Sequence, residues 1–520
     1  MNGEEETLTA DIPVGRRLRK NTASMALGVG LSRVTGLVRE QAFAILFGAS
    51  PAMDAFVAAF RVPNLFRDLL AENISSNCVL PVYTQEQKKS ADAAAIFAGG
   101  TLVLLVTVSL AIVLAGIVAA PELCRILVSG YVGDPVRFPL TVLLTRWLLP
   151  FLALISLTAF FQSLLNAHGR FFGPAASAAV LNILFVLLGW GFSRCVTPAV
   201  LGMAWGALLG AAGALGFLLL LARPAGIRLR LAPFWKVRSV GTMLLLAGPV
   251  VLGVAATNIN LFVNTIVATY AGGGALAYLN YSYRLMHLPL GLIGVSLGTA
   301  VLPALSRAAA HGQNEEFSGL LRRAVTYALL LAVPAALGMI LLRQDIVSVL
   351  YEHGRFSHKD TIAASLALFG YASGIPAFAL NRVLAPAFYS RLDSKTPVLC
   401  GAVAVACNIL LSVGAVWFGY GFVGIAAAAS AAGFLQTLLL TFFLHRRGWI
   451  ARPGDEETKG TKRRRSSIVV LLFGSVVMVG VILFVQRLGI ENRYLRLSAE
   501  ILAGAAGYLS ILFASRFREF

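Results

Sequence analysis

Long runs of apolar residues, separated by short polar intervals, dominate the sequence. A helix that crosses a hydrocarbon core of about 30 Å needs about 20 apolar residues, and stretches of that length recur along the whole chain. The longest polar interval, 445–466, is too short to fold as a soluble catalytic domain. The pattern predicts an all-α polytopic membrane protein with fourteen transmembrane helices, at about 22–47, 52–82, 92–119, 138–165, 173–193, 198–222, 240–270, 274–304, 322–342, 362–388, 396–418, 421–444, 467–486 and 497–515.

The composition strengthens the membrane assignment and narrows the chemistry. Hydrophobic residues make up 58% of the 520 residues and charged residues only 13%, which excludes an ordinary soluble protein. The polar, acidic N-terminus leads into a full-length apolar stretch without a cleavage pattern, so we expect no removable signal peptide. The five cysteines show no ligand spacing, so we expect no metal, no haem and no disulfide framework.

The positive charges predict the orientation in the membrane. If the basic cluster Arg16–Lys20 is cytoplasmic, the loops on that side and their edges hold 27 Lys and Arg residues against 9 on the other side. The positive-inside rule then places both termini in the cytoplasm. This asymmetry accounts for the net charge of +19 without nucleic acid, and we interpret the run Lys462–Arg465 as an anchor for anionic membrane lipids.

The chain also resembles itself at an offset near 222 residues. The matching positions include Ala49 with Ala271, Phe56 with Tyr278, Arg61 with Arg284, Val79–Pro81 with Val301–Pro303, and Pro174 with Pro397. The offset equals six spans, so it predicts two parallel six-helix repeats followed by two C-terminal helices, an architecture typical of transporters. The predicted parts are a cytoplasmic tail at 1–21, lobes at 22–222 and 240–444, cytoplasmic linkers at 223–239 and 445–466, and the last two helices with a short tail at 467–520.

Seven arginines and no lysines lie inside the predicted spans, not counting Arg322 and Arg323 at the edge of the stretch 322–342. Each central arginine costs about 2.5 to 3.5 kcal/mol to insert, so several together require water, counter-charges or a ligand. A guanidinium is always ionised and grips phosphate oxygens with two hydrogen bonds. An arginine-lined cavity would therefore suit a phosphate or a diphosphate. The seven are Arg33, Arg39, Arg61, Arg67, Arg146, Arg284 and Arg382, and the accompanying acids are chiefly Glu40, Asp54, Asp68 and Glu72.

The arginines do not all indicate a ligand equally. For Arg61, Arg146 and Arg382 we favour a structural role, whereas Arg33 lies about 16 Å into its span and is expected to face a cavity. Arg39, Arg67 and Arg284 are the strongest candidates for binding. Pairing of Arg39 with Glu40 is not expected, because adjacent residues of a helix point about 100° apart, and the same reasoning applies to Arg67 with Asp68 and Glu72. Pairing between helices stays open.

Catalytic chemistry is not indicated. The sequence holds no nucleophile with an adjacent base, no paired carboxylates and no phosphate-binding glycine loop, and His287 and His358 are isolated. We therefore predict a transporter rather than an enzyme, without a cofactor. Because no nucleotide-binding motif occurs, energy would have to come from an ion gradient, the membrane potential or consumption of the product.

Several motifs narrow the class of transporter. SRVTGLVRE at 32–40, MDAFVAAFRVPNLFRDLLAEN at 53–73, YRLMHLPLGLIGVSLGTAVLPALS at 283–306, YEHGRFS at 351–357 and LAPAFYSRLDSKTP at 384–397 are the most specific. Together they resemble the MurJ (MviN) family of lipid II flippases, within the multidrug/oligosaccharidyl-lipid/polysaccharide exporter superfamily. The resemblance extends over all fourteen predicted spans.

The resemblance implies a function and its partners. The protein would move lipid II, the undecaprenyl-diphosphate-linked peptidoglycan precursor, from the cytoplasmic to the periplasmic leaflet of a bacterial inner membrane. It would do so by alternating access, with a cationic central cavity binding the diphosphate and the last two helices forming a groove for the lipid tail. Lipid II, membrane lipids and the cell-wall synthesis machinery are the expected partners, and nucleic acid is not.

The resemblance also assigns roles to individual residues. Substrate binding is predicted for Arg33, Arg39, Arg67 and Arg284, and a gating or supporting role for Ser32, Asp54, Arg61 and Glu72. Two positions depart from the family pattern: Asn73 stands where a glycine is usual, and His287 where an acidic residue is common. The alternatives are a flippase for another polyprenyl-diphosphate-linked sugar, a drug exporter of the same superfamily, which would need acids rather than arginines, and a non-transporting scaffold.

Overall fold

The computed structural model describes residues 14–449 and 459–515, and all regular structure in these residues is helical. The chain divides into two compact units. The first comprises Met1–Leu46 and Ala55–Ile259, and the second Phe47–Asp54 and Asn260–Phe520. The segment Phe47–Asp54, which includes the link between the first two helices and the first turn of α2 (Pro51–Phe66), therefore belongs to the second unit. One long helix, α9 (Arg238–Thr269), begins in the first unit and ends in the second.

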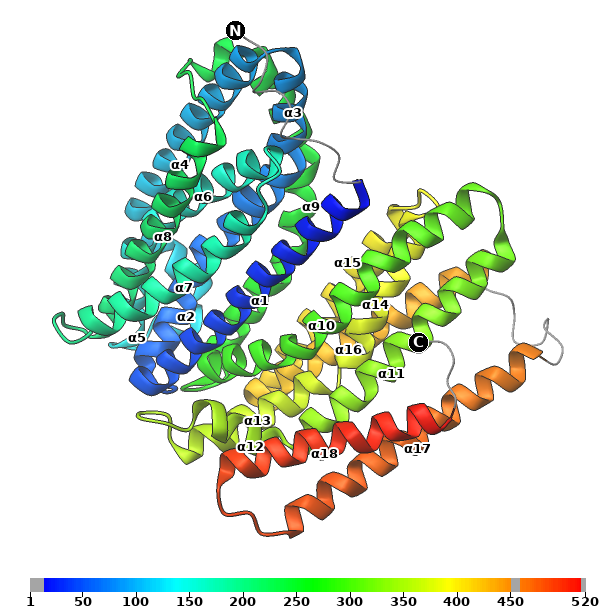
Figure 1. Cartoon of the computed structure of the whole chain (residues 1–520). Coiled ribbons are helices and arrows are strands. Elements are labelled where there is room, and N and C mark those ends of the chain that lie inside the picture. Colours follow the sequence, from blue (N-terminus) through cyan, green and yellow to red (C-terminus); the bar gives the residue numbers. More distant parts are fainter. Residues whose placement is uncertain (1–13, 450–458, 516–520) are drawn as a thin grey trace, which may run out of the picture. The chain divides into compact units, whose positions relative to one another are not determined.

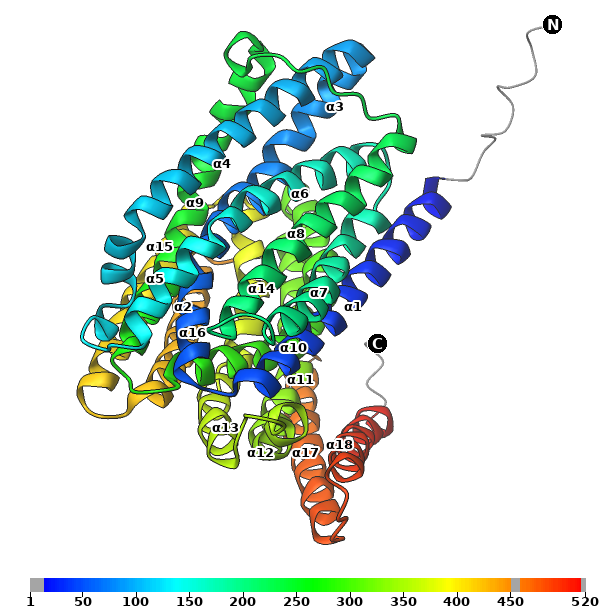
Figure 2. The ribbon, with the colours of Figure 1, turned by 90° about the vertical axis from the view of Figure 1, so that its left-hand side faces the viewer.

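The first unit is a bundle of antiparallel helices, seen side by side in Figure 2. Within it α7 packs closely on α8, and α6 packs on α4, α8 and the π-helical segment η1. Its elements are α1 (Val14–Phe47), α2 (Pro51–Phe66), η1 (Arg67–Val79), α3 (Leu80–Lys89), α4 (Ala91–Leu127), η2 (Ser129–Tyr131), α5 (Arg137–Leu148), α6 (Pro150–Ala167), α7 (Phe172–Phe192), α8 (Val200–Ala222), η3 (Arg223–Ala225), η4 (Phe234–Lys236) and the first part of α9.

A glycine repeat explains the close contact of α7 with α8. Gly202, Gly206 and Gly210 recur every four residues along one face of α8. A Cβ added to any of them would lie within 3 Å of the backbone of α7 or of Ser193, the residue that follows α7. Gly206 meets Gly189 of α7 backbone to backbone. Small residues at this spacing let the backbones of two transmembrane helices approach closely and pack by van der Waals contact.

The second unit contains a helical bundle and a C-terminal hairpin. In the bundle α10, α11, α13, α14 and α16 pack on one another, and α15 pairs with α16. The hairpin of α17 and α18 lies against α11 and α12 (Figure 1). The elements are the last part of α9, α10 (Ala275–Ala310), α11 (Asn314–Leu341), α12 (Arg343–Tyr351), α13 (His358–Ala372), α14 (Ile375–Tyr389), α15 (Lys395–Trp417), α16 (Gly421–Arg446), α17 (Lys459–Arg487) and α18 (Arg493–Ala514).

The helices confirm that the chain is an all-helical multi-pass membrane protein. Ten segments among the described residues are long and apolar enough to span a bilayer, and each coincides with one of the predicted stretches. The other four stretches, 22–47, 52–82, 240–270 and 274–304, are also helical, as α1, as α2 with η1 and α3, as α9 and as α10. Over the described residues these four are not both long enough and apolar enough to count as membrane spans. The number of fourteen transmembrane helices therefore stays a prediction.

Candidate substrate-binding site

A buried polar cluster on α1 and α7 contains the first of the predicted arginines. Arg39 of α1 donates through Nη1 to Oδ1 of Asn182 on α7 at 2.9 Å, and through Nη2 to Oε1 of Glu40 at 2.9 Å. Its side chain is 13% exposed and that of Glu40 only 2%. A charged pair this deep in a helix bundle is held by short, charge-assisted hydrogen bonds.

The same asparagine extends the cluster along α1. Nδ2 of Asn182 donates to the backbone oxygen of Ser32 at 3.3 Å and lies 3.4 Å from the hydroxyl of Thr35. Sequence reasoning missed Asn182, although an amide at the middle of an otherwise apolar span is a signal that could have identified it. Ser32 and Arg39, two of the predicted site residues, are thus brought to one face of α7.

Aromatic rings complete the surroundings of Arg39. Its guanidinium carbon lies 5.5 Å from the centre of the Phe185 ring and 5.9 Å from that of Phe43. Both distances are within the range of cation–π attraction. Phe43 and Phe185 also contact each other edge to face, at 5.4 Å between centroids. The rings therefore fix the guanidinium in position on its apolar side.

The expectation that Arg39 would not pair with Glu40 is wrong. Although adjacent Cβ atoms of a helix diverge by about 100°, the arginine side chain is long, and Asn182 and the two phenylalanines hold it along the helix toward the carboxylate. For Arg67 the same question lies outside the described residues, because the side chains of Asp68 and Glu72 are not among them.

The other predicted arginines of the first unit occupy different environments. Arg33 of α1 is exposed, and Arg61 of α2 is partly buried. Arg67 is partly buried at the first residue of η1, where α2 changes from α-helical to π-helical geometry a short distance after Pro63. Proline within a helix is a common cause of such irregularity, and π-helical turns are frequent at functional sites. The substrate-binding role of Arg33 and Arg67 stays a prediction.

Asp54 lies in the second unit and binds the start of α10. Its carboxylate accepts hydrogen bonds from the backbone N–H of Gly274 at 2.7 Å and of Ala277 at 3.1 Å, and the side chain is fully buried. A carboxylate at a helix N-terminus satisfies free N–H groups and interacts favourably with the helix dipole. Gly274 has a φ of +79°, which a residue with a side chain rarely adopts. This geometry is compatible with the supporting role predicted for Asp54.

The predicted arginine of the second unit, Arg284, lies on α10 and is partly buried. Beside it in sequence, the ring of Tyr283 packs on His287 at 4.3 Å and on Tyr371 of α13 at 5.7 Å, in edge-to-face arrangements. The departure at position 287 thus places an imidazole in an aromatic contact. The four predicted substrate-binding arginines are divided between the units, three in the first and one in the second.

Two intramembrane arginines bond to backbone oxygens of neighbouring helices. Nε of Arg146 donates to the carbonyl of Ile117 on α4 at 3.2 Å, and Nη1 of Arg382 donates to that of Leu290 on α10 at 2.9 Å. These contacts support the structural role that the sequence indicated for both. In the part of the chain that the structure describes, no group of three or more His, Cys, Asp and Glu is arranged to hold a metal ion.

Comparison with known proteins places this arrangement in a family. The family model described as lipid II flippase MurJ matches residues 43–500. A probable lipid II flippase MurJ of Vibrio cholerae is 33% identical over 96% of this chain and 97% of its own length. The lipid II flippase MurJ of Burkholderia cenocepacia is 33% identical over 80% of this chain and 82% of its own.

Solved structures agree with the sequence comparison. A lipid II flippase MurJ in an inward closed conformation superposes with a TM-score of 0.77 at 25% identity, over 95% of this chain and 98% of the other. An inward-facing multidrug resistance MATE family transporter has a TM-score of 0.70 at 14% identity, over 80% and 94% of the two chains, which shows a shared fold alone. The chain therefore belongs to the lipid II flippase MurJ family, a family of transporters rather than enzymes.

Proposed function

We propose that this protein is a lipid II flippase that moves the undecaprenyl-diphosphate-linked peptidoglycan precursor from the cytoplasmic to the periplasmic leaflet by alternating access. The observation that carries the proposal is family membership over residues 43–500, and the arginines placed at costly membrane positions support it. Under this proposal the energy comes from an ion gradient, the membrane potential or consumption of the product.

The proposal assigns the diphosphate to Arg33, Arg39, Arg67 and Arg284. Arg33 supports it most simply, because an exposed guanidinium on a membrane helix can bind an anion without first losing a partner. Arg39 has a second task, since it also neutralises Glu40. Ser32, Asp54, Arg61 and Glu72 are assigned gating or supporting roles.

Complementation tests the function. A bacterium whose own lipid II flippase is depleted should survive when this chain is expressed, and lipid II on the outer face of its inner membrane should return to normal. If lipid II stayed on the cytoplasmic side while the protein was present and folded, the assignment would fail. Rescue of a different polyprenyl-diphosphate sugar pathway instead would identify another substrate.

The proposal includes a topology of fourteen spans in the bacterial inner membrane, with both termini cytoplasmic. The charge asymmetry supports it through the positive-inside rule. Reporter fusions after Lys89 and at the C-terminus should report the cytoplasm, and a fusion at Gly273 should report the periplasm. A periplasmic C-terminus would show that the spans were miscounted.

A further inference from the structure

The C-terminal hairpin holds a buried carboxyl group that the transport proposal does not use. Glu500 lies on α18 and is completely buried, in a stripe whose other members are Leu497, Gly504, Tyr508 and Leu512. It is about seven residues, or roughly 10 Å, from the start of the helix. An acid thus interrupts the apolar face by which α18 packs.

The carboxyl oxygens of Glu500 have no hydrogen-bond partner. Both oxygens are buried and unbonded, and the amide of Gln486 on α17 lies near them without a hydrogen bond of ordinary geometry. An ionised carboxylate without donors in an apolar environment is strongly unfavourable, and such a group becomes neutral instead. The surroundings of Glu500 therefore favour the protonated acid.

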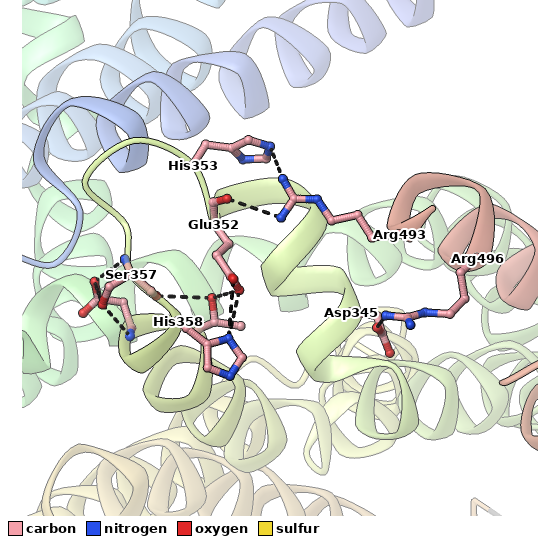
Figure 3. A network of polar contacts seen from close by, with 9 residues as sticks. Asp345, Glu352, His353, Ser357, His358, Arg493 and Arg496 are labelled. Carbon is pink, nitrogen blue, oxygen red and sulfur yellow. Dashed lines mark hydrogen bonds and ion pairs between the residues drawn. The ribbon is translucent and has the colours of Figure 1, made fainter. Parts of the chain in front are cut away.

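The nearest charged groups leave one negative charge in excess. Arg496, one turn before Glu500, donates through Nη2 to Oδ1 of Asp345 on α12 at 2.6 Å, whereas its Nε is 3.9 Å from Glu500 (Figure 3 shows the Asp345 contact). The guanidinium is thus hydrogen-bonded to Asp345 and forms only a longer ion pair with Glu500. With one cation and two acids, the triad of Asp345, Arg496 and Glu500 is neutral only when one acid carries a proton.

Among the side chains that the structure describes, Asp345 and Arg496 are the charged groups that act on Glu500. Arg487, at the end of α17, is exposed. Arg343 of α12 donates to the carbonyl of Ile340 and faces the ring of Phe369. On α11 the apolar residues that pack on this hairpin include Tyr327, Leu330 and Leu337, and the carbonyl of Leu330 accepts a hydrogen bond from Tyr508 at 2.7 Å.

We propose that Glu500 is a proton-binding site, and that its occupied, neutral form holds the α17–α18 hairpin against α11 and α12. Loss of the proton would bury a second negative charge beside Asp345 and weaken the packing of α18. The hairpin would then be docked while Glu500 carries its proton and released as the pH rises and the proton is lost. This inference goes beyond the proposed function and does not depend on it.

Infrared spectroscopy of the purified full-length protein in lipid nanodiscs, without lipid II, tests the site. A pH-difference spectrum should contain the carbonyl stretch of a protonated carboxylic acid that disappears at high pH. Glu500→Gln should remove that band, while Glu491→Gln, which changes an exposed carboxyl on the same hairpin, should retain it. A band that survives in Glu500→Gln would overturn the proposal.

Thermal unfolding supplies a second, independent readout. The wild-type protein should lose stability as the pH rises and Glu500 releases its proton, whereas Glu500→Gln should lose this part of the pH dependence and keep the stability of the protonated wild-type protein. If Glu500→Gln fails to fold, the wild-type protein must still show the band of the protonated acid at low pH and lose it at high pH. A wild-type band that is absent at every pH would refute proton binding.

Discussion

Arg39 and Arg496 are both partnered by acids, but their sites satisfy those acids differently. At Arg39 one guanidinium donates to one carboxylate and to the amide of Asn182, and two aromatic rings cover it. At Arg496 one guanidinium stands between two carboxyl groups and bonds to Asp345, leaving the oxygens of Glu500 without donors. The supply of hydrogen-bond donors, rather than the presence of an arginine, decides whether a buried acid can stay ionised.

The largest loss of stability is expected from truncating Arg39, whose site has more hydrogen bonds than that of Arg496. Arg39→Ala leaves Glu40 buried without its cation, which should destabilise the protein by about 3 to 5 kcal/mol. Thermal unfolding of the purified protein and its amount in the membrane would measure this. A variant as stable as wild type would show that Glu40 does not depend on Arg39.

A paired variant separates the structural task of Arg39 from its proposed task in transport. Arg39→Ala with Glu40→Gln removes both charges, so most of the folded protein should return, while complementation should still fail because the diphosphate has lost a ligand. Full activity of this double variant would exclude Arg39 from substrate binding.

Arg33 should show the opposite behaviour on the same helix. Because its side chain is exposed, Arg33→Ala should change stability by less than about 0.5 kcal/mol and yet abolish complementation. Arg33→Lys keeps the charge but loses the planar two-bond geometry, so partial activity is expected. An abundant and fully active Arg33→Ala protein would dismiss this residue as a ligand.

Removing the amide that organises the α1 cluster should have an intermediate effect. Asn182→Leu leaves Arg39 without one acceptor and removes the amide hydrogen bond to the Ser32 carbonyl, which should cost about 1 to 3 kcal/mol. Leu187→Ala, on an exposed part of the same helix, is the matched control and should be near neutral. Equal unfolding temperatures for the two variants would show that Asn182 does not hold the cluster together.

The smallest effect concerns the loop that follows α12. Burial lowers the pKa of His353 below its usual value of 6.5, and the positive charge of Arg493 lowers it further. The Arg493 guanidinium donates to Nε2 of His353 at 3.0 Å (Figure 3). The unfolded chain therefore binds the proton first, and the stability that this contact adds is present above about pH 6.5 and lost as the pH falls below it.

A stability titration between pH 7.5 and 5.5 checks this sign. Wild type should become less stable on acidification, and His353→Gln should show a smaller slope. This direction is the reverse of the one expected for Glu500, so the two contacts of α18 can be distinguished in a single pH series. An unchanged slope in His353→Gln would remove His353 from the account.

The positions of the helices could be predicted well, because the thickness of the bilayer fixes the length of an apolar helix. The stretch 173–193 corresponds to α7 at Phe172–Phe192. The irregularities were not predicted: 138–165 is divided into α5 and α6 before Pro150, and 52–82 contains the π-helix Arg67–Val79. Hydropathy reports how apolar a segment is and not how its backbone bonds are arranged.

The candidate site was predicted only in part, since a sequence shows charges but not their partners. The cost of insertion singled out Arg39, yet its contacts with Glu40 and Asn182 depend on the long-range packing of α1 on α7. Asp54 was singled out as an intramembrane acid, but its bonds to Gly274 and Ala277 join residues about 220 positions apart. Periodicity along one helix cannot supply such a partner.

Direct measurement of lipid II translocation is the most decisive test of the central claim. Purified protein reconstituted in vesicles with labelled lipid II should move the label to the opposite leaflet, under a membrane potential or an ion gradient, and Arg33→Ala should be folded but inactive in the same assay. Translocation by wild type and not by Arg33→Ala is the predicted result. Vesicles in which wild type moves no more lipid II than protein-free vesicles, or in which both proteins move it equally, would contradict the account.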